Sequence, residues 1–265
     1  MSRMLAVLIA ATLALTGCIG GPDTTEAVAA ATTYVQALAA ADYDTMASVS
    51  TGSANDAARY GQQVLLADPE AFSSRDLVVL EPLMVPDQGD GTVLDGELEL
   101  STKGISGAPL RIDTITMLAT ADGWKVDGYD RDGRNTAELF HNVTTGPHQL
   151  AFDGVDVASI HATVLLTDAA EDVVLLPISV TAGPQAVTIV PERSTFTLGG
   201  RRIPVSDVIG SASVEPLREQ VVVLVARQAP ATTAGDGDAV GIGVETDGVD
   251  VGPLEFELRP QPSSR

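Results

Sequence analysis

Cysteine is almost missing from this sequence of 265 residues, because Cys18 is the only one. A chain with a single cysteine forms no internal disulfide and cannot build a zinc site from paired cysteines. The three histidines, His141, His148 and His161, lack the short regular spacing that zinc ligands show. We therefore expect a fold that its hydrophobic cores hold together, with no metal site.

Positive charge is also scarce. Lysine and arginine together number 15 against 36 aspartates and glutamates, so the formal net charge is −21. A strongly acidic surface repels nucleic acid and anionic lipid head groups, and we expect no nucleic-acid partner. Two interpretations remain open. The charge keeps the protein soluble at a crowded cell surface, which we prefer, or it attracts a specific cationic partner.

Sequence motifs of common enzymes are absent. The sequence contains no G-x-S-x-G, no S-x-x-K and no glycine-rich loop ending in Gly-Lys-Ser/Thr. Gly241 and Gly243 in "GIGVET" begin a dinucleotide-binding pattern but lie in a strand-like run, where a bulge or close packing explains them better. We therefore expect no enzyme activity and no cofactor.

Two acidic clusters remain to be explained. Asp127, Asp130 and Asp132 precede Gly133, and "GDGD" occupies 235–238. The first resembles a calcium-binding loop only loosely, because it lacks the invariant glycine position and the glutamate at the twelfth place. We interpret both clusters as solvated turns.

No apolar run is long enough for a permanent membrane-spanning helix, which needs about 20 residues. The longest, Met4–Leu15, follows Arg3 and has the length of a signal peptide. It ends in Leu15-Thr16-Gly17-Cys18, which resembles the lipobox of bacterial lipoproteins. That resemblance implies a signal peptide at 1–17, a diacylglyceryl group on Cys18 and a tether at 18–23. It places the protein on the extracytoplasmic face of the bacterial cell membrane.

Helical periodicity comes first in the rest of the chain. In "TTEAVAAATTYVQALAAADY" the residues Val28, Ala31, Val35 and Leu38 form one stripe, and a second helical stretch covers 54–68. The period then changes to two, in strand-like segments at 76–87, 91–104, 109–123 and "GWKVDGYDRDG". In the last of these, Trp124 and Val126 point inward. Helices followed by an antiparallel sheet predict an α+β domain whose helices cover one face of the sheet.

The helix pair "YVQALAAADYDTMASV" and the closing "DGWKVDGYD" are similar to nuclear transport factor two-like domains, which are cone-shaped α+β folds. The similarity covers 24–131, and the family includes enzymes, ligand binders and inert spacers. Its ketosteroid isomerases use a pocket with an aspartate base and a hydrogen-bonding tyrosine. The resemblance implies Tyr34, Tyr43 and Asp113 as candidates here. Alternation with Leu110 and Ile112 directs Asp113 to solvent, which argues against this activity.

The remaining sequence predicts a polar linker at 132–147, an all-β domain at 148–260 and a tail at 261–265. Short valine-rich runs recur between turn pairs such as Asp153-Gly154, Gly199-Gly200 and Asp247-Gly248. This pattern predicts a β-sandwich and resembles immunoglobulin-like modules of cell-surface proteins. The Cys–Trp–Cys core of antibody domains is absent.

Together these features predict a lipid-anchored, non-catalytic interaction or spacer module that contacts an envelope protein or wall polymer. The alternative is a binder of a small apolar ligand, or an isomerase-like enzyme, that uses a cavity of the first domain. The side chains that line such a cavity distinguish the two hypotheses.

Overall fold

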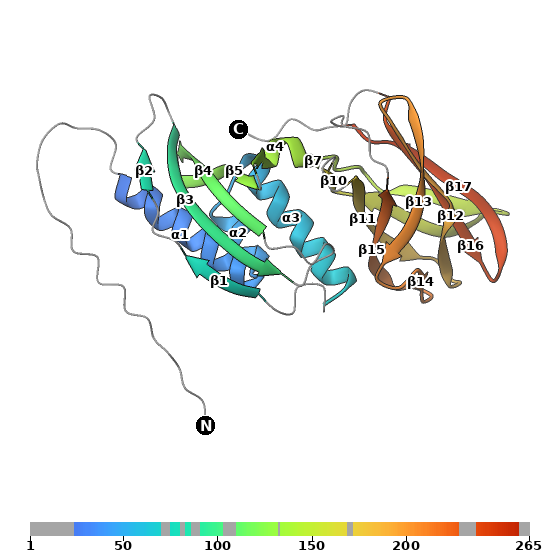
Figure 1. Cartoon of the computed structure of the whole chain (residues 1–265). Helices are drawn as coiled ribbons and strands as arrows, with labels where there is room; N and C mark the ends of the chain where they lie inside the picture. The colour runs from blue at the N-terminus through green and yellow to red at the C-terminus, as the bar shows by residue number, and fades with distance from the viewer. Residues whose placement is uncertain are drawn as a thin grey trace, which may run out of the picture.

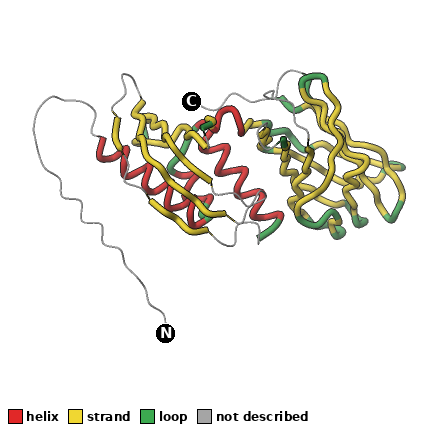
Figure 2. The backbone as a smooth tube through the Cα atoms, viewed as in Figure 1, coloured by secondary structure: helices red, strands yellow, loops and turns green. Residues whose placement is uncertain are grey.

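The structure is a computed structural model, which describes residues 24–69, 75–79, 83–85, 91–102, 110–131, 133–168, 172–227 and 237–259. The fold is rich in β-structure, with a few helices near the N-terminal side (Figures 1 and 2). Cys18 and the rest of the Leu15–Cys18 motif lie outside the described residues. No described helix is long and apolar enough to cross a membrane.

Three helices begin the described chain: α1 (Thr24–Ala40), α2 (Tyr43–Ser48) and α3 (Gly52–Ala67). The buried face of α1 centres on Ala27, Ala31, Tyr34 and Leu38. Val28 and Val35, which belong to the expected stripe, are only partly buried. The helix is therefore rotated from the expected orientation, so that the large Tyr34 ring fills the core.

The first sheet follows the expected strands closely. Its strands are β1 (Arg75–Val79), β2 (Leu83–Val85), β3 (Gly91–Thr102), β4 (Leu110–Thr120), β5 (Gly123–Arg131) and β6 (Arg134–Asn135). They are antiparallel in the order β1-β3-β4-β5-β6, with β2 beside β3. Helices α1 and α3 pack on β5. Val126 is fully buried and Trp124 packs partly buried against the same core, as predicted.

The second sheet contains eleven strands. They are β7 (Phe140–Asn142), β8 (His148–Phe152), β9 (Val155–Ala162), β10 (Val164–Asp168), β11 (Val173–Ala182), β12 (Val187–Leu198), β13 (Arg201–Ile209), β14 (Ser213–Val214), β15 (Glu219–Arg227), β16 (Ala239–Thr246) and β17 (Val249–Glu257). The main path runs β17-β16-β12-β13-β15-β11-β10-β7. All described pairings in it are antiparallel, and the neighbours β10-β11, β12-β13 and β16-β17 are also consecutive in the chain.

The second sheet curls because β13 changes partner along its length. Arg201–Pro204 pair with β12, whereas Val205 and Asp207–Ile209 pair with β15, with a register shift between Val205 and Asp207. The curling brings β8 near β17, where the rings of His148 and Phe256 stack with centroids 4.4 Å apart. A hydrophobic core fills the space inside the curl.

The turns at Asp153-Gly154, Gly199-Gly200 and Asp247-Gly248 join consecutive strands, as the sequence predicts. Both residues of each pair have positive φ, for example 49° at Asp247 and 74° at Gly248. Turns of this kind match the right-handed twist of the strands that they connect. Local turn chemistry therefore sets the register of these hairpins.

Strands β10, β11 and β15 are buried on both faces. Along β15, Val222 and Leu224 point into the core inside the curl, whereas Val223 and Val225 belong to the core beneath the helices. Helix α3 covers this outer face by packing against β7, β10 and β15 (Figure 1). Helix α3 thus contacts both sheets, with β5 on one side and β15 on the other.

The segment 132–147, for which the sequence predicts a linker, contains β6, helix α4 (Thr136–Leu139) and β7. Asn135 caps α4 by accepting a hydrogen bond from the Ala137 amide. Leu139 and Phe140 are buried in the helix-side core, and β7 pairs with β10. Packing therefore ties much of this segment to its surroundings.

Candidate functional site

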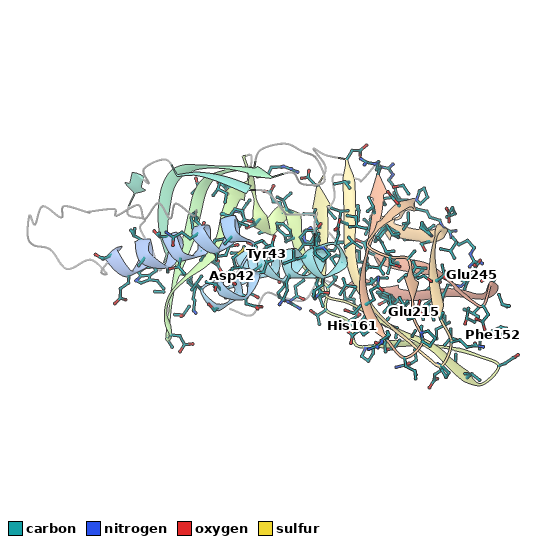
Figure 3. The ribbon with its side chains drawn as sticks, turned by 90° about the horizontal axis from the view of Figure 1, so that it is seen from below. Asp42, Tyr43, Phe152, His161, Glu215 and Glu245 are labelled. Carbon is teal, nitrogen blue, oxygen red and sulfur yellow. The ribbon has the colours of Figure 1, made fainter. Side chains whose placement is uncertain are left out.

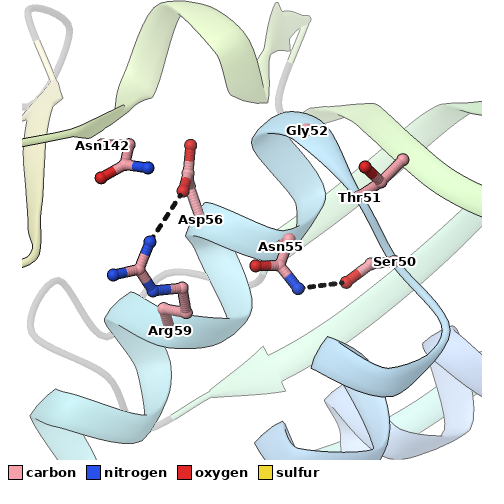
Figure 4. A pocket seen from close by; sticks show the side chains of 7 residues that line it. All are labelled: Ser50, Thr51, Gly52, Asn55, Asp56, Arg59 and Asn142. Atoms are coloured by element: carbon pink, nitrogen blue, oxygen red, sulfur yellow. Dashed lines mark hydrogen bonds and ion pairs between the residues drawn. The ribbon is translucent and has the colours of Figure 1, made fainter. Parts of the chain in front are cut away.

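A polar pocket of about 150 Å³ lies at the start of α3, close to β7 (Figure 4). Its lining residues are Ser50, Thr51, Gly52, Asn55, Asp56, Arg59 and Asn142. Six of the seven come from a short stretch of chain, whereas Asn142 comes from the second sheet. The pocket therefore forms only where α3 meets that sheet.

The entry into α3 is fixed by hydrogen bonds to β5. The Thr51 amide donates to the Val126 carbonyl at 2.8 Å, and the Val126 amide donates to the Val49 carbonyl at 3.0 Å. Gly52 has a φ of +51°, and a Cβ atom there would lie 2.3 Å from Oδ1 of Asp127. Only glycine adopts this positive φ readily and also lacks the Cβ atom that would clash with Asp127. The backbone conformation at this corner of the pocket is therefore well defined.

The wall beside α2 is also well ordered. The Ser50 hydroxyl donates to the Met46 carbonyl at 2.7 Å. The Asn55 side-chain amide donates to the Ala47 carbonyl at 3.1 Å and reaches the Ser50 hydroxyl at 3.4 Å (Figure 4). These bonds leave the two side chains little freedom to rearrange.

Asp56 and Arg59 supply opposite charges to the pocket. Asp56 is only 6% exposed, and its Oδ1 lies 3.6 Å from Nη1 of Arg59 (Figure 4). Among the described residues, no donor makes a hydrogen bond to the Asp56 carboxylate. Burial raises the pKa of Asp56 to about 6, and the Arg59 charge offsets only part of that effect.

Arg59 is held from the opposite side. Its Nη2 donates to the Thr144 hydroxyl at 2.9 Å. Thr144 in turn donates to Oδ1 of Asn142 from its amide at 3.1 Å and from its hydroxyl at 2.7 Å. This chain of hydrogen bonds fixes the guanidinium at the pocket and orients the Asn142 side chain.

Replacing Asp56 with asparagine is expected to stabilise the protein at pH 8 by about 1–2 kcal/mol. The folded-state pKa of Asp56 lies above the unfolded value, so ionisation opposes folding. The wild type should therefore lose stability as the pH rises from about 4 through about 6, and Asp56→Asn should remove that slope. Urea unfolding between pH 4 and 8 measures both quantities. Asp122→Asn, at an exposed position, is the matched control; equal pH dependence in both variants would contradict this prediction.

The tyrosines named by the family resemblance lie elsewhere. Tyr34 is fully buried, and its hydroxyl donates to the Ala54 carbonyl at 3.0 Å. Burial raises its pKa well above the usual value. Tyr43 lies among the helices and packs against Gly61 (Figure 3). Neither tyrosine lines the polar pocket, and the side chain of Asp113 lies outside the described part of the structure.

The histidines are separated in space. His141 is buried, and its Nε2 forms a 2.9 Å hydrogen bond with the Thr167 hydroxyl. Burial lowers the pKa of His141. His148 stacks on Phe256, and His161 lies on β9 (Figure 3). Within the described ranges, no group of three or more His, Cys, Asp or Glu residues could hold a metal ion.

The acidic clusters of the sequence have structural contacts. Oδ1 of Asp130 accepts a hydrogen bond from Asn135 at 3.0 Å. Asp238, the last residue of "GDGD", is buried and accepts a hydrogen bond from the Gly199 amide at 2.8 Å. Asp132 and the residues 235–236 lie outside the described residues. Asp238 therefore ties two turns together and is not a solvated residue, which corrects the expectation for this position.

Sequence reasoning missed the polar pocket. Asp56 is a lone acid in the alanine-rich helix segment "ANDAARY", where Ala57 and Tyr60 are buried with it. The sequence signal that indicated a site was an acidic residue on the buried side of a helix. Carboxylates are seldom buried without a partner, so such a residue suggests a polar site. Asn142 gave no such signal, since its place depends on the packing of β7.

Comparisons with known proteins add no family assignment. No protein-family model and no curated protein matches the chain. A crystal structure of a functionally unknown protein from Listeria monocytogenes EGD-e is similar at 8% identity and a TM-score of 0.28. The match covers 45% of this chain and 85% of that one. At this TM-score it supports no conclusion about fold or function.

Proposed function

We propose that this chain is a lipid-anchored lipoprotein on the extracytoplasmic face of a bacterial membrane, where it acts as a non-catalytic interaction or spacer module. One observation carries the proposal: Arg3, the apolar run Met4–Leu15 and the lipobox-like end at Cys18 occur in the order of a lipoprotein signal. Residues 1–17 are then removed, and Cys18 becomes the first residue of the mature protein.

The anchor suffices by itself to hold the protein at a membrane. A diacylglyceryl group has two acyl chains, and each buried methylene contributes about 0.8 kcal/mol. A single acyl chain gives only marginal binding, whereas two give stable attachment. The anchor also overcomes the repulsion between anionic head groups and a chain of net charge −21.

The body of the protein is suited to a spacer or docking module. In this proposal residues 24–131 form an α+β unit of the nuclear transport factor two-like type, and 148–260 form an immunoglobulin-like sandwich. Support comes from the packing of α1 and α3 on β5 and from the core inside the curled second sheet. Helix α3 contacts both sheets. A mechanical force that acts on one unit is therefore transmitted to the other through packed side chains. The partner is an envelope protein or a wall polymer.

The alternative function, an apolar-ligand binder or isomerase-like enzyme, requires polar groups that point into an apolar cavity. Tyr34 is one of the candidates that the family resemblance implies, and its hydroxyl already donates a hydrogen bond to the Ala54 carbonyl. The described pocket is instead lined by polar and charged residues. We therefore prefer the non-catalytic module.

Replacing Cys18 with alanine is expected to abolish lipidation and membrane attachment, because no other thiol exists to accept the lipid. Radiolabelled palmitate incorporation and intact mass, measured on protein from a lipoprotein-processing bacterial host, report the modification. Membrane fractionation reports the attachment. Gly21→Ala, just beyond the lipobox, should behave like the wild type. A wild-type chain that is recovered soluble, with no lipid on Cys18, would refute the proposal.

A further inference from the structure

We propose that the polar pocket at the start of α3 binds a free α-amino acid with a small side chain. Asp56 binds its ammonium group and Arg59 binds its carboxylate. The inference does not rest on the lipid anchor, so the two proposals can fail separately. It follows from the charge arrangement, the unused hydrogen-bonding capacity and the size of the pocket.

The spacing of the two charges matches a zwitterion. Oδ1 of Asp56 and Nη1 of Arg59 are 3.6 Å apart, which is too long for a hydrogen bond between them. In an α-amino acid, the ammonium and carboxylate groups are attached to one carbon atom and are therefore also close neighbours. Such a ligand gives the buried Asp56 carboxylate a charge-assisted hydrogen bond that the described residues do not supply, and it engages further donors of the partly exposed Arg59.

Both charged groups have capacity for a ligand. The Asp56 side chain is 9% exposed and, within the described structure, accepts no hydrogen bond. A carboxylate so deeply buried is costly unless it is paired and hydrogen-bonded. Arg59 has five N–H donors, of which the described structure engages one, to the Thr144 hydroxyl. That bond holds the guanidinium in place beside the pocket that Arg59 lines.

The pocket restricts the ligand to small polar molecules. A volume of about 150 Å³ accommodates a ligand of about six heavy atoms, and the hydroxyl and amide groups of Ser50, Thr51, Asn55 and Asn142 line it. Large apolar side chains find no apolar surface there. We therefore expect glycine, alanine or serine to fit better than leucine or phenylalanine.

Other small ligands satisfy the site less well. A simple anion is repelled by Asp56, and a simple cation is repelled by Arg59. A neutral sugar supplies no charge to either group, which leaves Asp56 with only its 3.6 Å contact to Arg59. No aromatic side chain lines the pocket to stack on a sugar ring. A zwitterion alone pairs both charges at once.

The test compares four probes on the purified full-length chain by isothermal titration and by NMR chemical-shift changes. Alanine carries both charges, N-acetylalanine lacks the ammonium, alaninamide lacks the carboxylate, and glucose is neutral. Alanine is expected to bind at least about tenfold more tightly than each of the other three, because each charge-assisted bond contributes that much or more. Equal binding of alanine and glucose, or no binding of alanine, would overturn the proposal.

Two variants assign the charges. Asp56→Asn should remove the preference for alanine over N-acetylalanine, and Arg59→Gln should remove the preference over alaninamide. Asp122→Asn and Arg201→Gln, at exposed positions, are the matched controls and should bind like the wild type. Far-UV circular dichroism checks that all variants are folded. If both pocket variants retain the wild-type preferences, the pocket is not the site and the assignment fails.

Discussion

Replacement of Val223 by aspartate is expected to lower the free energy of unfolding by at least about 4 kcal/mol, because an unpaired charge would be buried. Val223 is fully buried on β15, and its side chain belongs to the core that α3 covers. Its neighbours Val222 and Leu224 fill the other core. No position in the middle of this strand offers a solvated face to the new carboxylate. A loss of this size is a large part of the total stability of an ordinary domain, about 5–15 kcal/mol.

The matched control is Val249→Asp, because Val249 is a strand valine that is 50% exposed. Its free energy of unfolding should change by no more than about 0.5 kcal/mol. Urea unfolding followed by circular dichroism measures both variants. If Val223→Asp were as mild as the control, the outer face of β15 would be open to solvent and α3 would not cover it.

The same experiment reports on the link between the two sheets. Trp124 is the only tryptophan, and it packs against the core that also contains Val223 and Val225. A loss of packing at β15 should therefore change Trp124 fluorescence at the same urea concentration as the circular dichroism. Two separate transitions would show that the helix-side core is not shared between the two parts of the chain.

Replacement of Gly61 by alanine is expected to cost about 3 kcal/mol, although alanine is intrinsically the better helix former by about 1 kcal/mol. Gly61 lies in α3, and a Cβ atom there would be 2.1 Å from Cε1 of the Tyr43 ring. The ring is itself buried, with 5% of Tyr43 exposed, so it has no empty space into which to move. The steric clash therefore outweighs the gain in helix propensity.

A double-mutant cycle with Tyr43→Ala tests that reason. Removing the ring costs stability by itself, but Gly61→Ala should then become neutral or slightly stabilising. Thermal and urea unfolding of the four proteins give the interaction free energy. If Gly61→Ala lowers the free energy of unfolding by the same amount when the Tyr43 ring is absent, the steric explanation is wrong.

Much of the local structure could be predicted from the sequence. The strand expected at 109–123 appears as β4, the helix expected from Ala54 appears as α3, and the pair Asp247-Gly248 forms the expected turn. These features depend on residues that are neighbours along the chain. Side-chain alternation, helix propensity and turn chemistry act over a few residues, so a single sequence contains the necessary information.

The sequence also indicated that some strands are buried on both faces. The prediction of two separate domains did not use this information. The runs "VVLLPISV" in β11 and "VVVLVA" in β15 are apolar without alternation. Strands buried on both faces have such continuous runs, whereas half-solvated strands alternate. The run alone does not say what covers the second face. Here α3 does so, because it packs against β15.

The polar pocket shows most clearly what could not be predicted from the sequence alone. Asp56 and Arg59 lie one helical turn apart, so their proximity follows from the sequence. The contribution of Asn142, and the hold of Thr144 on Arg59, depend on β7 lying beside α3. Sequence reasoning therefore looked for a site at Tyr34 and Tyr43, which the structure places in the packed core.

By itself the sequence determined the order and type of most elements, the tight turns and the expectation of a lipid on Cys18, because each depends on short-range chemistry. Tertiary structure alone decided which strand faces are covered, that α3 contacts both sheets, and that Asp56 is buried beside Arg59 at a polar pocket. Burial is the physical reason for the difference. Whether a side chain meets water or protein depends on segments far away in the chain, and the energies of charges and apolar groups depend on that contact.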